Sequence, residues 1–297
     1  MNEKQMHRRA LLMLIGISLI WGTSYLGVQA AIDSGLPFSF ILGGRFLLGA
    51  LLIGLFPGQS IQRGQSLLRG MVGGILIYFA FYCQTEGQSE ASISTAAFLT
   101  ATNVVMIPFI HWAFSGKKPA KKVFFCSLLT LGGVFLLSYR PGQSFALDEG
   151  GLMVLLGAFL FAVHMVYLGD SVLKADPGSV TFWQLLTAGV LGALFTLAGR
   201  QTVTADMLSK GALPVLYVGL LATGLCYYLE AKAQKHVDPS RTGIVLSMEG
   251  VYGAFFSIVM GLERFRPQVA LGGLIITLSV VLMEIDPRTW FHRQADA

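Results

Sequence analysis

Apolar residues run in ten blocks along this chain, and short polar breaks separate the blocks. Each block holds roughly 20 residues, the length at which a helix crosses about 30 Å of hydrocarbon. The pattern predicts membrane-spanning helices at 10–31, 37–56, 67–87, 91–114, 120–139, 150–170, 178–199, 212–232, 241–261 and 267–285. The breaks carry turn chemistry, as in Asp176-Pro177-Gly178 and Asp238-Pro239-Ser240. We therefore expect an all-α polytopic membrane protein with ten transmembrane helices.

The second half of the sequence repeats the first. Asn103-Val104-Val105 falls opposite Glu249-Gly250-Val251 at an offset of 146, and Ile15 to Tyr25 lies over Leu155 to Met165 at an offset of 140. Five spans per half would place the second copy in the membrane upside down. The prediction is two inverted five-helix repeats, 10–139 and 150–285, with cytoplasmic tails at 1–9 and 286–297. Inverted repeats are typical of secondary transporters, which bind substrate near the midplane.

Composition supports a membrane protein and explains the net charge. The chain is 54% hydrophobic and 12% charged, whereas soluble domains carry about 25% charged residues. With a cytoplasmic N-terminus, fifteen of the 21 Lys and Arg residues fall on inner segments and five on outer links. This bias predicts that both termini are cytoplasmic. The charge of +5 then reports topology, and we expect no nucleic-acid partner.

The cysteines give no sign of a disulfide framework or a metal site. Cys83, Cys126 and Cys226 all fall inside apolar blocks, without the spacing of metal ligands. We predict no metal and no other cofactor.

Polar residues inside the predicted spans are candidates for function, because a charge in hydrocarbon costs at least about 2.5 kcal/mol on insertion scales. Glu249 lies near the midplane, where it could bind a substrate ammonium, couple protons, or hold the two halves together. His164 could titrate near neutral pH or make an interhelical hydrogen bond. Asn103 is the repeat counterpart of Glu249 and is expected to line a cavity. For Arg45 we favour neutralising a carboxylate or capping broken backbone over binding an anion.

Aromatic residues mark helix faces that could line the same cavity. Tyr78, Tyr82 and Glu86 are four residues apart and share one face of their helix, and Tyr228 matches Tyr82 in the second repeat. Such a stripe can also serve helix packing alone.

Two further patterns bear on the ends of spans. Trp21 and Tyr25 share a face of the first span, with Gly22 between them relieving backbone packing. Glu230 and Lys232 lie near the inner end of the eighth span, where long side chains can reach water.

Several motifs appear in the order typical of one family. They are Ile20-Trp21-Gly22-Thr23-Ser24, Phe40 to Phe46 with Arg45, the run from Asp238-Pro239-Ser240-Arg241 through Glu249-Gly250-Val251-Tyr252 to Gly261-Leu262-Glu263, and Ala270 to Ile276. The chain resembles the drug/metabolite transporter superfamily, specifically ten-span members with two EamA domains. It departs from that pattern in having Glu249-Gly250 where the family often has Glu-Pro, and Gly116-Lys117-Lys118 at the end of the first repeat.

The resemblance implies a secondary transporter of a small metabolite, often an exporter of amino acids or related solutes, that works by alternating access. It also implies a central cavity lined by spans 1, 3, 4, 6, 8 and 9. That arrangement would gather Trp21, Tyr78, Tyr82, Asn103, His164, Tyr228 and Glu249 around the cavity. Tyr25, which shares a helix face with Trp21, completes the expected substrate-binding residues. Glu249 and His164 are also the candidates for proton coupling.

The expected partners are a small-molecule solute, the lipid bilayer and protons, in a bacterial inner membrane, with the choice between monomer and homodimer open. The chain is not expected to be an enzyme. A membrane-embedded enzyme acting on a lipid-linked substrate would need clustered acids, metal ligands or an exposed nucleophile with its base, and the sequence offers no such set. A passive channel is the other alternative.

Overall fold

A computed structural model describes residues 2–90, 93–139, 148–262 and 264–285 of this protein. Across these residues all regular structure is helical, and nine helical segments are long and apolar enough to cross a membrane. A shorter apolar helix, Phe38–Gly54, makes the tenth. The predicted all-α fold with ten transmembrane helices is confirmed.

The helices follow the predicted blocks closely. In the first half they are α1 (Glu3–Asp33), α2 (Phe38–Gly54), α3 (Gln65–Glu90), α4 (Ile93–Ala101), α5 (Asn103–Ser115) and α6 (Lys121–Ser138). In the second half they are α7 (Glu149–Lys174), α8 (Pro177–Ala198), α9 (Ala205–Leu216), the π-helix η1 (Tyr217–Leu225), α10 (Cys226–Ala233), α11 (Pro239–Leu246), α12 (Met248–Val259) and α13 (Pro267–Glu284). Thus α4–α5, α9–η1–α10 and α11–α12 are each one interrupted span.

Polar residues in the breaks start the next helix. The side chains of Asp148, Asp176 and Asp238 accept hydrogen bonds from backbone N–H groups in the first turns of α7, α8 and α11. Thr204 does the same for α9. Each cap satisfies one of the N–H groups that a helix leaves unpaired at its start, so the turn chemistry read from the sequence sets these boundaries.

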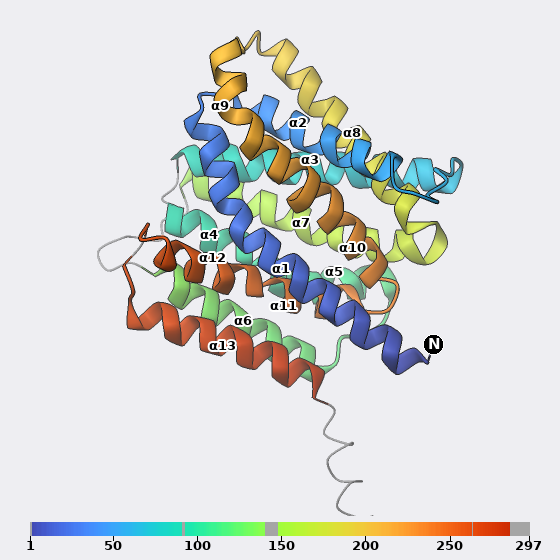
Figure 1. The fold of residues 1–297 in the computed structure, drawn as a ribbon. Coiled ribbons are helices and arrows are strands. Elements are labelled where there is room, and N and C mark those ends of the chain that lie inside the picture. Colours follow the sequence, from blue (N-terminus) through green and yellow to red (C-terminus); the bar gives the residue numbers. More distant parts are fainter. Residues whose placement is uncertain (1, 91–92, 140–147, 263, 286–297) are drawn as a thin grey trace, which may run out of the picture.

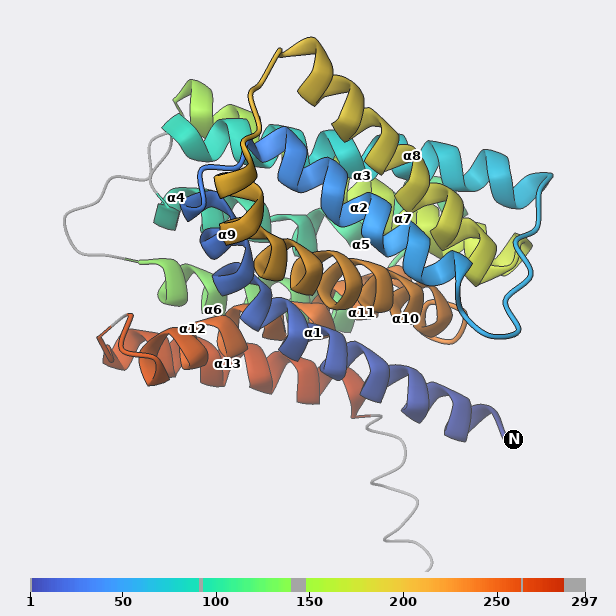
Figure 2. The same cartoon turned by 45° about the horizontal axis from the view of Figure 1, so that its top comes forward.

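The two halves interlock into one bundle (Figures 1 and 2). The most extensive helix contacts, α2 with α8, α3 with α7 and α8, and α6 with α13, each join one helix from either half. Glycines permit two of these approaches: a Cβ on Gly192 would lie 2.5 Å from the Cα of Gly43, and one on Gly133 would lie 2.8 Å from the carbonyl oxygen of Gly272. Small residues are the usual means of close helix contact in membranes.

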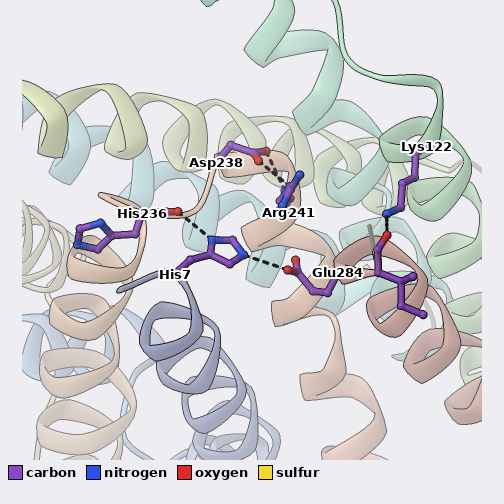
Figure 3. A network of polar contacts seen from close by, with 7 residues as sticks. His7, Lys122, His236, Asp238, Arg241 and Glu284 are labelled. Carbon is purple, nitrogen blue, oxygen red and sulfur yellow. Dashed lines mark hydrogen bonds and ion pairs between the residues drawn. The ribbon is translucent and has the colours of Figure 1, made fainter. Parts of the chain in front are cut away.

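Hydrogen bonds between loops define two ends of the bundle. At one end, which we call the basic end, Gln59 Nε2 donates to Asp176 Oδ2 over 3.0 Å. His7 at the same end lies 3.2 Å from the carbonyl oxygen of His236 and 3.0 Å from Glu284 Oε2 (Figure 3). At the opposite end, Arg266 Nη1 donates to the carbonyl oxygen of Tyr139. The chain therefore alternates between two ends, as a multi-pass membrane protein must.

Candidate functional site

Two spans break at matching places in the two halves. Thr102 separates α4 from α5, and Ser247 separates α11 from α12. Each hydroxyl donates back to a carbonyl three residues earlier, Thr102 to Leu99 and Ser247 to Ile244, both over 2.6 Å. Side-chain bonds of this kind compete with the backbone ladder and bend helices. At the offset of 146, position 102 corresponds to 248, so the two breaks agree within one residue.

Four of the predicted aromatic site residues gather in one hydrophobic cluster. Trp21, Tyr82 and Tyr228 pack against a buried core that contains Tyr78 and Tyr227. The Tyr78 and Tyr82 rings lie 6.4 Å apart, and those of Trp21 and Tyr227 lie 5.7 Å apart. The Tyr78 hydroxyl is buried, and it has no hydrogen-bond partner within the described residues. We call this group the aromatic cluster.

His164 lies at the edge of the aromatic cluster. Its side chain is buried, its Nε2 lies 3.0 Å from Gln184 Oε1, and its ring centroid lies 6.1 Å from that of Tyr227. The hydrogen bond joins α7 to α8, which is the structural role considered for this histidine. Gln184 was not recognised from the sequence, although an amide within an apolar block was a signal that could have found it.

Arg45 binds the irregular helix of the second half. It is buried on α2, and its Nε donates to Thr223 Oγ1 of η1 over 2.9 Å. Its guanidinium carbon lies 4.7 Å from the centroid of the Phe81 ring and 5.7 Å from that of Phe46. Cation–π contacts of this kind are strengthened where water is excluded. Since π-helices occur frequently at functional sites, Arg45 and Thr223 join the candidate site.

Glu249 lies on α12, where this helix crosses α1. A Cβ on Gly22 would lie 2.6 Å from Tyr252 Cβ and 3.0 Å from the carbonyl oxygen of Glu249. The absence of a side chain at position 22 therefore lets α12 pack closely against α1. The charge of Glu249 acts on Tyr227 and Glu230 of α10. Glu249 is therefore electrostatically linked to the aromatic cluster.

The remaining two predicted residues lie elsewhere or cannot be placed. Asn103 begins α5 and is half-buried, and its neighbours Val104 and Ile107 pack into clusters other than the aromatic one. Tyr25 continues α1, but its side chain lies outside the described part of the structure.

Glu230 does not reach water, contrary to the expectation for the end of a span. It is 1% exposed and Gln234 is 3% exposed, and Gln234 Nε2 donates to Glu230 Oε1 over 3.0 Å. Within the described chain, Glu230 Oε2 and Gln234 Oε1 have no hydrogen-bond partners. Glu230 lies behind Gln234, and Gly169 of α7 packs against the Gln234 side chain, so neighbouring helices cover the pair.

Lys232 behaves as expected. It is exposed, and its Nζ lies 4.4 Å from the centroid of the Tyr228 ring, which stacks on Phe56 at 5.2 Å. Tyr228 therefore faces the basic end with a cation over its ring.

A cleft of about 510 Å³ opens at the basic end between the two halves, and its lining includes Gln234. The first half contributes the end of α5, and the second half contributes the end of α7 and the loop from α10 to α11. Its charged lining is Lys117, Lys174 and Lys235 against Asp170 and Asp238, and two histidines, His111 and His236, also line it. Asp170 is already paired, 2.6 Å from Lys174 Nζ and 2.9 Å from Arg69 Nη1. The cleft gives the basic end access to buried polar groups.

Comparisons with known proteins agree with this architecture. The model of the EamA-like transporter family matches residues 8–139 and again residues 149–285. An uncharacterized transporter of Archaeoglobus fulgidus is 25% identical, over 91% of this chain and 83% of its own length. The uncharacterized transporter YwfM of Bacillus subtilis is 22% identical over 93% of this chain and 94% of its own. The uncharacterized inner membrane transporter YicL of Salmonella typhimurium is 21% identical over 95% of this chain and 97% of its own length.

A solved crystal structure shares the fold. It aligns with a TM-score of 0.80, covers 98% of this chain and 99% of its own, and is 18% identical in sequence. At that identity the likeness concerns the arrangement of helices alone.

Proposed function

This chain belongs to the EamA-like transporter family, and we propose that it is a secondary transporter that exports a small organic metabolite by alternating access. The observation that carries the mechanism is the pair of matching breaks at Thr102 and Ser247. Transporters built from inverted repeats bind their substrates where such discontinuous helices meet near the midplane.

The proposed solute is an amino acid or a related zwitterionic or cationic compound. The half-buried rings of Trp21 and Tyr82 offer faces to a cation, and Glu249 offers a carboxylate to an ammonium. The basic lining of the cleft suits the carboxylate of the same solute. We assign solute binding to Trp21, Tyr25, Tyr78, Tyr82, Asn103, His164, Tyr228 and Glu249, with Glu249 and His164 as the groups through which protons would be coupled.

We infer that the basic end faces the cytoplasm, in a bacterial inner membrane. The excess of Lys and Arg on the segments of that end supports this orientation through the positive-inside rule. A relative named as an inner membrane transporter supports the location. In this orientation the cleft would receive solute from the cytoplasm.

The test is efflux from proteoliposomes that are loaded with radiolabelled amino acids and small organic cations, with and without an imposed proton gradient. We expect saturable efflux of one compound class that responds to the gradient. Glu249→Gln should abolish transport or its dependence on the gradient. Glu149→Gln, at the exposed start of α7, is the control and should transport normally.

The outcomes separate the alternatives. Normal transport by Glu249→Gln at every pH would remove the carboxylate from the mechanism. Flux that neither saturates nor shows counterflow would indicate a channel, and turnover of a lipid-linked substrate without solute movement would indicate an enzyme.

A further inference from the structure

Glu230 and Gln234 form a buried pair whose hydrogen bonding is incomplete. One carboxylate oxygen accepts from the amide, and the other is without a donor in the part of the chain that the structure describes, as is the amide oxygen. Burying an ionised carboxylate with an unpaired oxygen is costly. A ligand that supplies a donor to these oxygens would remove the cost.

The position of the pair limits what that ligand can be. Gln234 and Gly169 are part of the cleft lining, whereas Glu230 lies one side chain behind Gln234. A solute in the cleft can therefore touch the Gln234 side of the pair. A proton needs no such space, and it can reach Glu230 through water in the cleft.

We propose that Glu230 is a proton-binding site that serves the transporter and that Gln234 transmits its protonation state to the cleft. This inference rests on the proposed transport function, since it supplies a further coupling site for that function. It adds a carboxylate that the sequence had placed in water to the groups considered for coupling.

The amide chemistry provides the link. When Glu230 is ionised, Gln234 Nε2 donates to it, and Gln234 Oε1 lies beside Gly169. When Glu230 takes a proton from water on the oxygen that faces Gln234, its O–H becomes a donor toward the amide, and the amide turns over so that Gln234 Oε1 accepts it. The NH₂ group then faces Gly169, and the floor of the cleft changes from hydrogen-bond acceptor to donor. Return of the proton to water reverses the change.

The groups around Glu230 favour an exchangeable proton over a fixed ion pair. Glu249 of α12 is a carboxylate whose charge acts on Glu230, and Cys226 and Tyr227 lie on the same helix. From α7 come His164, beside Tyr227, and Asp170, which is paired with Arg69 and Lys174. Arg45 of α2 acts on Tyr227 and Cys226. Helix α8 and residues 10–24 of α1, also packed here, contain no charged side chain.

Infrared spectroscopy of the full protein in lipid bilayers tests the proposal without any solute. During a pH titration, we expect the carbonyl band of a protonated carboxylic acid that disappears reversibly as pH rises. The band should be absent in Glu230→Gln and present in Glu149→Gln, with both variants showing wild-type circular dichroism. Presence of the full band in Glu230→Gln would overturn the assignment.

Gln234→Met tests the amide. It keeps the length of the side chain but cannot accept the Glu230 proton through an amide oxygen, so the carbonyl band should move to higher frequency. An unmoved band would refute the turn of the amide. These readouts involve no transport. If Glu230 titrates in a protein that moves no solute, the proposed function is contradicted and the proton site is not. Gradient-driven transport by a protein that shows no Glu230 band would contradict the proton site and leave the proposed function in place.

Discussion

Trp21 Nε1 donates a hydrogen bond to the carbonyl oxygen of Ala222 over 2.7 Å, and this bond joins the first helix of one half to the π-helix of the other. A π-helix distorts the regular i to i−4 ladder, so its carbonyls benefit from outside donors. Trp21 thus contributes to the aromatic cluster through its ring and to the irregular backbone through its N–H.

Replacing this indole with a phenyl ring removes the N–H and part of the packed volume but keeps an aromatic side chain. We expect the lost hydrogen bond in Trp21→Phe to lower the free energy of unfolding by about 0.6 kcal/mol, and at most about 1.7 kcal/mol, the range for hydrogen bonds between membrane helices, and the smaller ring to add a packing loss. Thermal unfolding in detergent measures the change. Trp112→Phe, on the exposed side of α5, is the control, and an equal loss in both variants would contradict a specific role for the bond.

The contact between α6 and α13 offers a matched pair of glycines. A Cβ on Gly133 would lie 2.6 Å from Ile276 Cγ1, whereas one on Gly132 would meet nothing within 4 Å. Gly133→Ala should therefore destabilise the protein by about 1–3 kcal/mol through overpacking. Gly132→Ala should be neutral or slightly stabilising, because alanine favours helix. Thermal midpoints of the two variants measured side by side decide the matter, and the opposite order would disprove the close contact.

Gly22 and Gly16 allow the same comparison on α1. A Cβ on Gly22 would lie 2.8 Å from the backbone nitrogen of Gly253, and one on Gly16 would meet nothing within 4 Å. We expect Gly22→Ala to push α12 and Glu249 away from α1, and to reduce efflux at least tenfold, the effect of about 1.4 kcal/mol. Gly16→Ala should transport at the wild-type rate. Wild-type efflux from Gly22→Ala would show that this crossing does not position Glu249.

Asp176, in the link between α7 and α8, gives a pH dependence of stability. Burial raises its pKa, but hydrogen bonds from the Ser179 backbone N–H, the Ser179 hydroxyl and Gln59, with the charge of Lys235, outweigh burial and lower the pKa below its usual value. A lowered pKa means that the folded protein binds the proton more weakly than the unfolded chain does. The stabilisation is therefore present above about pH 3.9, the ordinary pKa of aspartate, and is lost as pH falls through the folded value.

Two substitutions at this position separate charge from capping. Asp176→Ala should lower the free energy of unfolding by about 0.5–2 kcal/mol at pH 7 through loss of the cap. The difference in stability between this variant and wild type should shrink on acidification. Asp176→Asn keeps a capping side chain and does not titrate, so its advantage over Asp176→Ala should not change with pH. Thermal midpoints recorded against pH provide the measurement, and a deficit of Asp176→Ala that grows in acid would reverse the assigned sign.

The sequence predicted most of the helices because each span is a continuous apolar block closed by a turn residue. It did not predict the breaks at Thr102 and Ser247, since a single hydroxyl in an apolar run reads as an ordinary helical residue. The π-helix was also not predicted, because Tyr217 to Leu225 is an ordinary apolar stretch, and its contacts with α1 and α2 do not show in the sequence.

The sequence indicated which aromatic residues share a helix face, but it did not indicate burial that depends on packing against another helix. Trp21, Tyr78, Tyr82 and Tyr228 gather in one hydrophobic cluster, and their role in binding a solute stays a prediction. The burial of Glu230 depends on Gln234 and on Gly169, which another helix supplies. No pattern within the span of Glu230 carries that information.

The π-helix also fixes the rotational phase of α10, the helix that continues the same span. Nine residues of η1 wind less per residue than an α-helix would, so the faces of α10 are offset from those of α9. Conversion of η1 to α-helix would turn Tyr227 and Glu230 about the axis of the span and, because an α-helix rises more per residue, would also lengthen the span. The winding of η1 therefore decides which buried groups of α10 meet α1, α7 and α8.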